Sequence, residues 1–177
     1  MTRMATMVHA AISRFAHMDA PLITAVNGAA GLSKALAADI VLASDRAKLV
    51  SAYTASGLPP DGSLTYFLAK HVGLLRAKEL ILTNRVLAAQ GACDWGLVTR
   101  VVAANDLLEE ARKLAATLAV GPTKAFGRAK QLLETAYNES LETQLDKETR
   151  AIAAMMQTDD AQNGIDAFLS KRSPAFL

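Results

Sequence analysis

One acidic residue lies where the local backbone can present its side chain for chemistry. Asp61 follows two prolines in the segment Gly57-Leu58-Pro59-Pro60-Asp61-Gly62-Ser63 and precedes a helix expected over 64–71. The prolines fix the backbone, Gly62 permits a tight bend, and Ser63 is predicted to cap the helix. A carboxylate held in this way can accept and return a proton, so Asp61 is the candidate acid/base. A Pro-Asp-Gly segment is also an ordinary turn, and the local pattern leaves both interpretations open.

The elements that must position Asp61 follow from the spacing of apolar residues. An amphipathic helix is predicted over residues 4–15, and a βαβ pattern follows, with strands at Leu22–Val26 and Ile40–Ala43 and a short helix at Leu32–Ala38. A further short strand is expected at Lys48–Ser51. Helices dominate after Asp61, with one more strand at 97–102; we expect them over residues 64–71, 74–83, 88–95, 106–119, 122–136, 139–157 and 159–170.

Composition limits the classes of protein that this chain can belong to. It has 177 residues, of which 51% are hydrophobic and 20% charged, as expected of a globular domain with a real core. The net charge of +2 comes from interspersed signs, which argues against a nucleic-acid or membrane-surface partner. Cys93 is the single cysteine, and the histidines (His9, His17 and His71) have no metal-ligand spacing. With no apolar run or leader pattern, we expect a cytoplasmic protein that binds no metal.

Five segments occur in a characteristic order: Ala20–Gly28, Leu36–Ser44, Glu79–Thr83, Trp95–Val102 and Ala167–Arg172. Together with the Asp61 turn, this order resembles the enoyl-CoA hydratase/isomerase (crotonase) family over roughly residues 4 to 177. The resemblance implies an α/β fold, with a crotonase-like ββα spiral core over residues 1–104 and a helical trimerisation region over 105–177. It is nearest to the enoyl-CoA isomerases, including the epoxyphenylacetyl-CoA isomerase type.

The resemblance also implies an oxyanion hole, in which two backbone N–H groups hold the carbonyl oxygen of an acyl-CoA thioester. Matching backward from Asp39 places one donor at Ala30, backed by Gly31, in a turn about three residues shorter than is usual in the family. Gly28 and Ala29 are expected to line the substrate. The alternative is a simple strand-to-helix turn. The family's second donor belongs to an upstream Ala-Gly-x-Asp segment that the residues before Met18 do not contain, so we expect a fragment, a partner that supplies the donor, or lost activity.

The same matching separates isomerisation from hydration. Family hydratases activate water with two glutamates, and the matched positions here hold Ser33 and Tyr53, which are poor bases at neutral pH. Asp61 matches the single carboxylate of the isomerases, and one carboxylate suffices for a double-bond shift. The resemblance therefore favours an acyl-CoA isomerase. Hydratase activity and a catalytically silent oligomeric scaffold are the alternatives.

The resemblance implies further contacts with the substrate and between subunits. Tyr53 and Leu58 are expected beside the thioester, and Phe168 and Lys171 beside the coenzyme A of a neighbouring subunit, although Lys171 also fits a solvated helix end. Coenzyme A enters as part of the substrate, so no separate cofactor is expected. The predicted assembly is a homotrimer or hexamer.

Overall fold

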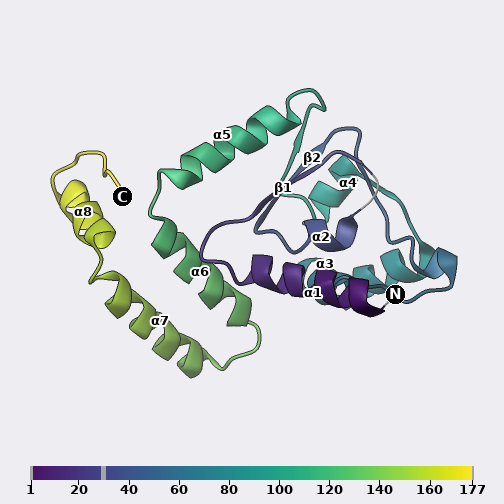
Figure 1. Cartoon of the computed structure of the whole chain (residues 1–177), viewed down its shortest axis with the longest axis horizontal. Helices are drawn as coiled ribbons and strands as arrows, with labels where there is room; N and C mark the ends of the chain where they lie inside the picture. Colours follow the sequence, from purple (N-terminus) through teal and green to yellow (C-terminus); the bar gives the residue numbers. More distant parts are fainter. Residues whose placement is uncertain (1, 29–30, 177) are drawn as a thin grey trace. The chain divides into compact units, whose positions relative to one another are not determined.

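Figure 1 shows the computed structural model, which describes residues 2–28 and 31–176. These residues form two compact units, one made of residues 2–16 and Leu22–Lys113 and the other of His17–Pro21 and 114–176. The predicted limits of a spiral core at 1–104 and an oligomerisation region at 105–177 stay predictions. In chain order the elements are α1 (Thr2–Ala16), β1 (Ile23–Val26), α2 (Leu32–Ala35), β2 (Ile40–Ser44), β3 (Lys48–Leu49), a 3-10 turn (Thr54–Ser56), α3 (Leu64–Thr83), β4 (Leu87–Ala88), α4 (Ala89–Asp94), β5 (Arg100–Val102), α5 (Leu107–Ala119), α6 (Thr123–Thr135), α7 (Leu141–Met155) and α8 (Asp159–Leu169).

A three-stranded parallel sheet in the order β1-β2-β5 organises the first unit. Ile23 of β1 pairs with Ile40 of β2, and Leu42 of β2 pairs with Arg100 of β5. The helix α2 connects β1 to β2, so the predicted βαβ pattern is confirmed. A parallel pair needs such a crossover, because the chain must return to the same end of the sheet before it begins the second strand.

A second, antiparallel pair joins β3 to β4, with Lys48 opposite Ala88 and Leu49 opposite Leu87. The strand predicted over 48–51 is therefore only two residues long, and β4 lies where the sequence predicted the start of a helix. The predicted strand over 97–102 is also shorter. Leu97 and Val98 are buried in the core, and the Leu97 N–H donates to Ala92, which closes the turn after α4 before the strand begins at Arg100.

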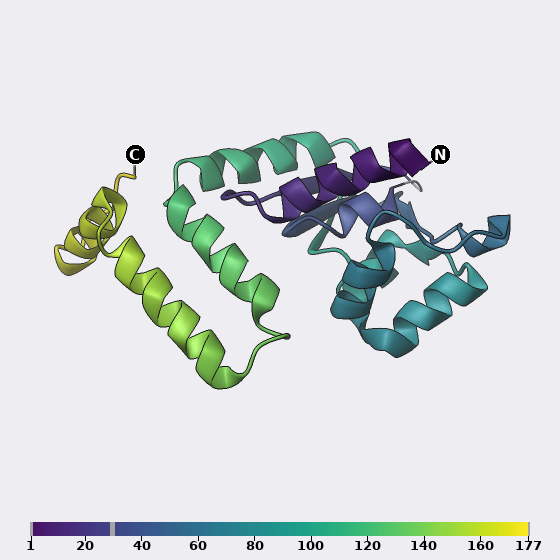
Figure 2. The same cartoon turned by 60° about the horizontal axis from the view of Figure 1, so that its bottom comes forward.

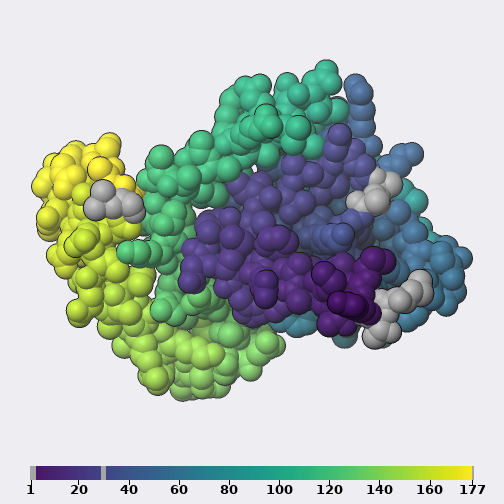
Figure 3. Space-filling model, in the orientation of Figure 1, coloured from purple at the N-terminus to yellow at the C-terminus, as the bar shows by residue number. Residues whose placement is uncertain are grey.

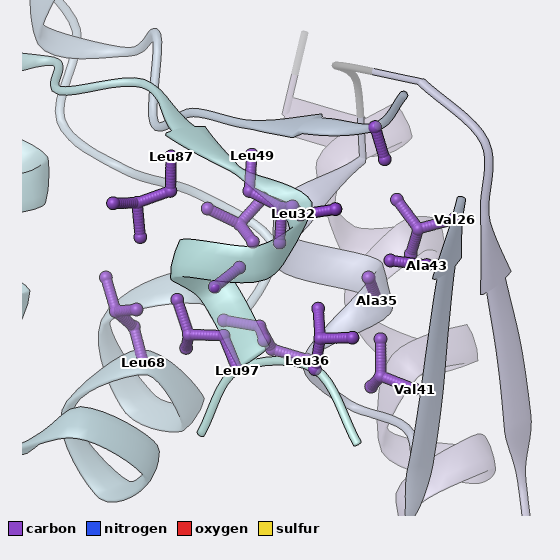
Figure 4. Packing of buried hydrophobic residues seen from close by; sticks show 14 of the residues in the cluster. Val26, Leu32, Ala35, Leu36, Val41, Ala43, Leu49, Leu68, Leu87 and Leu97 are labelled. Atoms are coloured by element: carbon purple, nitrogen blue, oxygen red, sulfur yellow. The ribbon is translucent and has the colours of Figure 1, made fainter. Parts of the chain in front are cut away.

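The core of the first unit forms where α2, α3 and α4 meet both sheets. Figure 4 shows five leucines from four elements pointing toward one another: Leu32 and Leu36 in and just after α2, Leu49 on β3, Leu68 on α3, and Leu87 on β4. Burying a leucine side chain completely stabilises a fold by about 1.5–3 kcal/mol before the cost of ordering it. Packing of these five leucines thus fixes the position of α3, the helix that directly follows the turn at Asp61.

The helix α3 is broken near its middle. Gly73 has φ 76° and ψ 162°, which is not helical, so helices on either side meet at an angle, and Figure 2 shows two segments running in different directions. The predicted end of one helix near Gly73 and start of another at residue 74 are confirmed. Glycine suits this position because an L-residue with a side chain rarely adopts positive φ.

Helices make up most of the second unit. Ser140 and Thr158 cap α7 and α8, because their hydroxyl oxygens accept hydrogen bonds from the N–H groups of Thr143 (3.2 Å) and Ala161 (3.3 Å). α6 packs against α7. Large apolar side chains are nonetheless exposed along α7, namely Leu141, Leu145, Ile152 and the adjacent Met156. Among the described residues no helix combines the length and the apolar character needed to span a bilayer.

Candidate active site

Asp61 lies in the turn immediately before α3, as predicted, and its side chain is about half exposed (51%). The prediction that Ser63 caps α3 through its side chain is wrong. Ser63 occupies the cap position, but its backbone is left-handed (φ 69°), and its hydroxyl donates to the carbonyl of Gly62 instead. A capping serine normally has an extended backbone that aims its oxygen at the helix N–H groups. The tight turn through Gly62 (φ 64°) removes that geometry.

A histidine from α1 contacts the Asp61 carboxylate. Nε2 of His9 lies 2.5 Å from Oδ1 of Asp61, although the two residues are 52 positions apart in the chain. The N–H of Gly62, and then the hydrogen bond and charge of His9, hold the pKa of the Asp61 carboxyl below its usual value. Asp61 is therefore ionised at neutral pH and can accept a proton or attack an electrophile, at the cost of some basicity.

Sequence reasoning did not include His9 in the site. The residue was grouped with histidines that lack metal-ligand spacing, and its position in an amphipathic helix says nothing about a partner 52 residues away. Only the packing of α1 against the Asp61 turn reveals the pair. Figure 3 shows α1, in the darkest purple, on an open face of the first unit.

Both α1 and α2 meet the turn at Gly62, which is buried. A methyl group placed there would lie 3.3 Å from Cβ of Ser33 in α2 and 3.7 Å from Cδ1 of Ile12 in α1. The Ser33 hydroxyl lies 3.2 Å from the phenolic oxygen of Tyr53, just before the 3-10 turn. The structure thus packs the turn that carries Asp61 against Ser33, which in turn contacts Tyr53; the family resemblance matched these three residues to catalytic positions.

A cavity of about 410 Å³ opens between α1, β1 and α2. It is lined mainly by apolar side chains, including Val8, Ile12, Phe15 and Val26, with Gly31 and Lys34 at the α2 side. Gly31 precedes α2 with φ 93°, so the predicted oxyanion turn ends in a conformation that glycine favours. Ala29 and Ala30, the predicted substrate contact and N–H donor, lie outside the described residues. Gly28 is exposed and has open space beside its α-carbon.

The remaining predicted residues lie in different parts of the chain. The exposed Leu58 donates its N–H to the carbonyl of Tyr53 (3.1 Å), so its backbone lies beside that of Tyr53. Phe168, 83% exposed on α8, and Lys171, which has φ 51° just after it, belong to the second unit. Within residues 2–28 and 31–176, no three His, Cys, Asp or Glu side chains gather closely enough to hold a metal ion.

The comparison with protein families settles which family carries this arrangement. Residues 2–177 match the model of the family described as enoyl-CoA hydratase/isomerase. The chain belongs to the enoyl-CoA hydratase/isomerase family. The crystal structure of an enoyl-CoA hydratase/isomerase from Cupriavidus metallidurans CH34 superposes with a TM-score of 0.91 and 34% sequence identity, over 99% of this chain and 67% of that one. The expected crotonase fold is therefore confirmed.

The names of similar proteins indicate different chemistry. The chain is 39% identical over 168 residues to the 1,2-epoxyphenylacetyl-CoA isomerase of Escherichia coli K12, covering 93% of the chain and 64% of the relative. It is 33% identical over 166 residues to 4-chlorobenzoyl coenzyme A dehalogenase-1 of an Arthrobacter species, covering 92% and 60%. The chain thus spans a little under two thirds of the length of these relatives.

Proposed function

We propose that this chain acts on an acyl-CoA thioester as an isomerase that shifts a carbon–carbon double bond, with Asp61 as the acid/base. The observation that carries the proposal is the ionised, half-exposed carboxylate of Asp61, in a turn that packs against Ser33 through Gly62. At the positions where family hydratases would hold carboxylates, Ser33 and Tyr53 have only hydroxyl groups, which bond to each other. One carboxylate can move a proton between two carbons. Hydration through two carboxylates lacks both of them at these matched positions.

The proposed reaction has two proton transfers. Asp61 removes a proton from one carbon of the acyl chain, and electrons shift toward the thioester carbonyl to give a dienolate. The resulting carboxylic acid of Asp61 then returns the proton to another carbon, so the double bond moves and no atom is gained or lost. Backbone N–H groups aimed at the carbonyl oxygen lower the barrier by roughly 3–4 kcal/mol per donor. We assign one such donor to Ala30, supported by the left-handed Gly31.

The cavity between α1, β1 and α2 is the proposed site for the apolar acyl group. It adjoins Gly31 at one side, and Ile12 connects it to the Asp61 turn, because the same side chain lines the cavity and lies 3.7 Å from where a Cβ on Gly62 would be. About 410 Å³ is within the range of small-ligand sites.

The proposal extends to the assembly of the protein. We propose a homotrimer or hexamer in the cytoplasm, in which Phe168 and Lys171 contact coenzyme A across a subunit boundary. Coenzyme A enters as part of the substrate, so we propose no separate cofactor.

Turnover of a 3-enoyl-CoA to its 2-enoyl isomer tests the proposal directly. The Asp61→Asn variant keeps the shape of the side chain but cannot accept a proton, so isomerisation should fall by about 10²–10⁴-fold. Binding of the thioester, measured by calorimetry, should change little. An Asp61→Asn variant with wild-type turnover would refute the role of Asp61. Fast hydration of crotonyl-CoA would instead favour the hydratase, and binding without any turnover would favour a silent scaffold subunit.

A second candidate function is hydrolytic dehalogenation of an aromatic acyl-CoA. The ionised state of Asp61 favours it, because a carboxylate of lowered pKa can act as a nucleophile even where it is a weak base. A carboxylate oxygen would bond to the halogen-bearing ring carbon and expel halide, and water would then cleave the ester and restore the carboxylate. A relative bears the name of such a dehalogenase. Chloride release from 4-chlorobenzoyl-CoA, absent in Asp61→Asn, distinguishes this function from isomerisation.

A further inference from the structure

We propose that His9 is a positioning residue for Asp61: its imidazole holds Oδ1 of the carboxylate and so leaves the other acceptor sites of Asp61 directed at the substrate. The inference rests on the proposed isomerase function and extends it to a residue on α1. The two side chains meet at 2.5 Å between Nε2 and Oδ1.

The hydrogen-bonding capacity of the carboxylate supports this role. An ionised carboxylate offers about four acceptor sites. His9 and the N–H of Gly62 take two of them, so acceptor capacity remains for a proton from substrate. Because Asp61 is half exposed, nothing in a packed core would otherwise hold its side chain in one rotamer. A displacement of the carboxylate by about 1 Å from its reactive position can lower the rate of proton transfer by about 10²-fold.

His9 also stands apart electrostatically from the other groups at the turn. α2 contributes the hydroxyl of Ser33, and the segment before the 3-10 turn contributes the phenol of Tyr53. The turn itself contributes the Gly62 N–H. In the described part of the chain, the ion pair assigned to Asp61 is therefore the one with His9. The position of His9 on α1 links the base to the same helix that lines the acyl cavity through Val8 and Ile12.

Two substitutions separate orientation from charge. His9→Ala removes both the hydrogen bond and the positive charge, whereas His9→Gln keeps an N–H donor without a charge. His17→Gln is the matched control, because His17 is an exposed histidine of the second unit that faces Glu134. Thermal unfolding of each variant checks that it folds, which the half-exposed position of His9 favours.

The measurements are the titration of the Asp61 carboxyl carbon by NMR and the pH dependence of kcat and KM for a 3-enoyl-CoA. In His9→Ala the carboxyl titration, and the acid limb of the rate profile, should move to higher pH, since the hydrogen bond of His9 and then its charge hold the pKa of the Asp61 carboxyl down. The shift should be smaller in His9→Gln, which keeps an N–H donor. kcat at its plateau should fall about 10- to 100-fold in His9→Ala with KM changed less than about twofold, and should be largely restored in His9→Gln. His17→Gln should match the wild type.

Two results would overturn the proposal. An unchanged carboxyl titration in both His9 variants would show that the contact does not exist in solution, and an unchanged plateau kcat in His9→Ala would show that it does not position the base. A wild-type chain with no isomerase turnover would overturn the proposed function and the positioning role with it. The carboxyl titration would still decide separately whether the His9–Asp61 pair forms.

Discussion

Ser33 and Tyr53 share a hydrogen bond of 3.2 Å between their hydroxyl oxygens, at the positions where the family resemblance expects two water-activating carboxylates. The side chains come from separate elements 20 residues apart, and Ser33 is almost fully buried. At these matched positions the chain thus has two hydroxyl groups that hydrogen-bond to each other. We interpret this pair as structural, with Asp61 as the group that transfers protons.

Substituting Tyr53→Phe should therefore change isomerisation little, by less than about threefold, because no proton of the proposed reaction passes through the phenol. The variant should be less stable, since it leaves the buried Ser33 hydroxyl without this partner, which costs about 1–3 kcal/mol. Chemical denaturation alongside the 3-enoyl-CoA assay measures both effects. A loss of activity comparable to that of Asp61→Asn would contradict the structural interpretation.

Gly62 and Gly57 form a matched pair for testing the turn at Asp61. Both have left-handed backbones, with φ 64° and 70°, so alanine at either position costs about 1–2 kcal/mol of conformational strain. At Gly57 an added methyl group meets open space, whereas at Gly62 it lies 3.3 Å from Cβ of Ser33. We expect Gly62→Ala to destabilise the fold more than Gly57→Ala and to lower kcat by displacing Asp61. Equal free energies of unfolding and equal kcat in the two variants would show that the turn does not pack against α2.

In the second unit, Gly127 and Gly164 should respond in opposite directions to alanine. A methyl group on Gly127, in α6, would lie 2.7–2.8 Å from backbone atoms of Asp19, which cannot move aside as a side chain can. Gly127→Ala should cost about 1–3 kcal/mol. On Gly164, in α8, a methyl group meets the Phe176 ring at an ordinary 3.6 Å, so the helix-favouring substitution should stabilise by about 0.5–1 kcal/mol. Denaturant midpoints test both signs, and a stabilising Gly127→Ala would disprove the close approach.

The exposed apolar side chains of α7 predict self-association. Leu141, Ile152 and the adjacent Met156 expose between 46% and 68% of their surface. A helix that faces only water usually has polar residues on its exposed face. Light scattering should give the mass of a trimer or hexamer at micromolar concentration. Ile152→Glu should lower that mass, whereas replacing the already polar, exposed Glu148 with alanine should not. A stable wild-type monomer would argue against assembly through this helix.

Sequence periodicity located most elements of the fold, for physical reasons visible in particular residues. The strands β1 and β2 were predictable because short β-prone runs flank a turn of small residues, and the break in α3 because Gly73 interrupts a helical pattern. The pair of β3 and β4 was not predictable at its true length. Two-residue strands carry no alternating pattern, and their pairing depends on Leu49 meeting Leu87 across the core.

In the candidate site too, the sequence predicted the residues whose positions depend on local sequence and missed the one whose position depends on tertiary packing. Asp61 could be predicted because prolines and glycine define its turn locally. Ser63 was predicted as a cap from residue type alone, and the left-handed backbone that prevents capping comes from the turn as a whole. His9 could not be predicted, since its contact with Asp61 arises from the tertiary packing of α1.

The strand order of the parallel sheet has a consequence for how the first unit opens. β2 is hydrogen-bonded on both sides, by β1 and by β5, whereas among the described residues β1 is paired with β2 alone. In a parallel strand, alternate residues direct their N–H groups to opposite neighbours. Every β2 amide proton that faces a neighbouring strand should therefore exchange with deuterated solvent only when the sheet separates, while alternate amides of β1 should exchange through small local fluctuations. β1 and β5 are both edge strands of this sheet, and β1 is the one that leads directly into the turn beside the cavity between α1, β1 and α2.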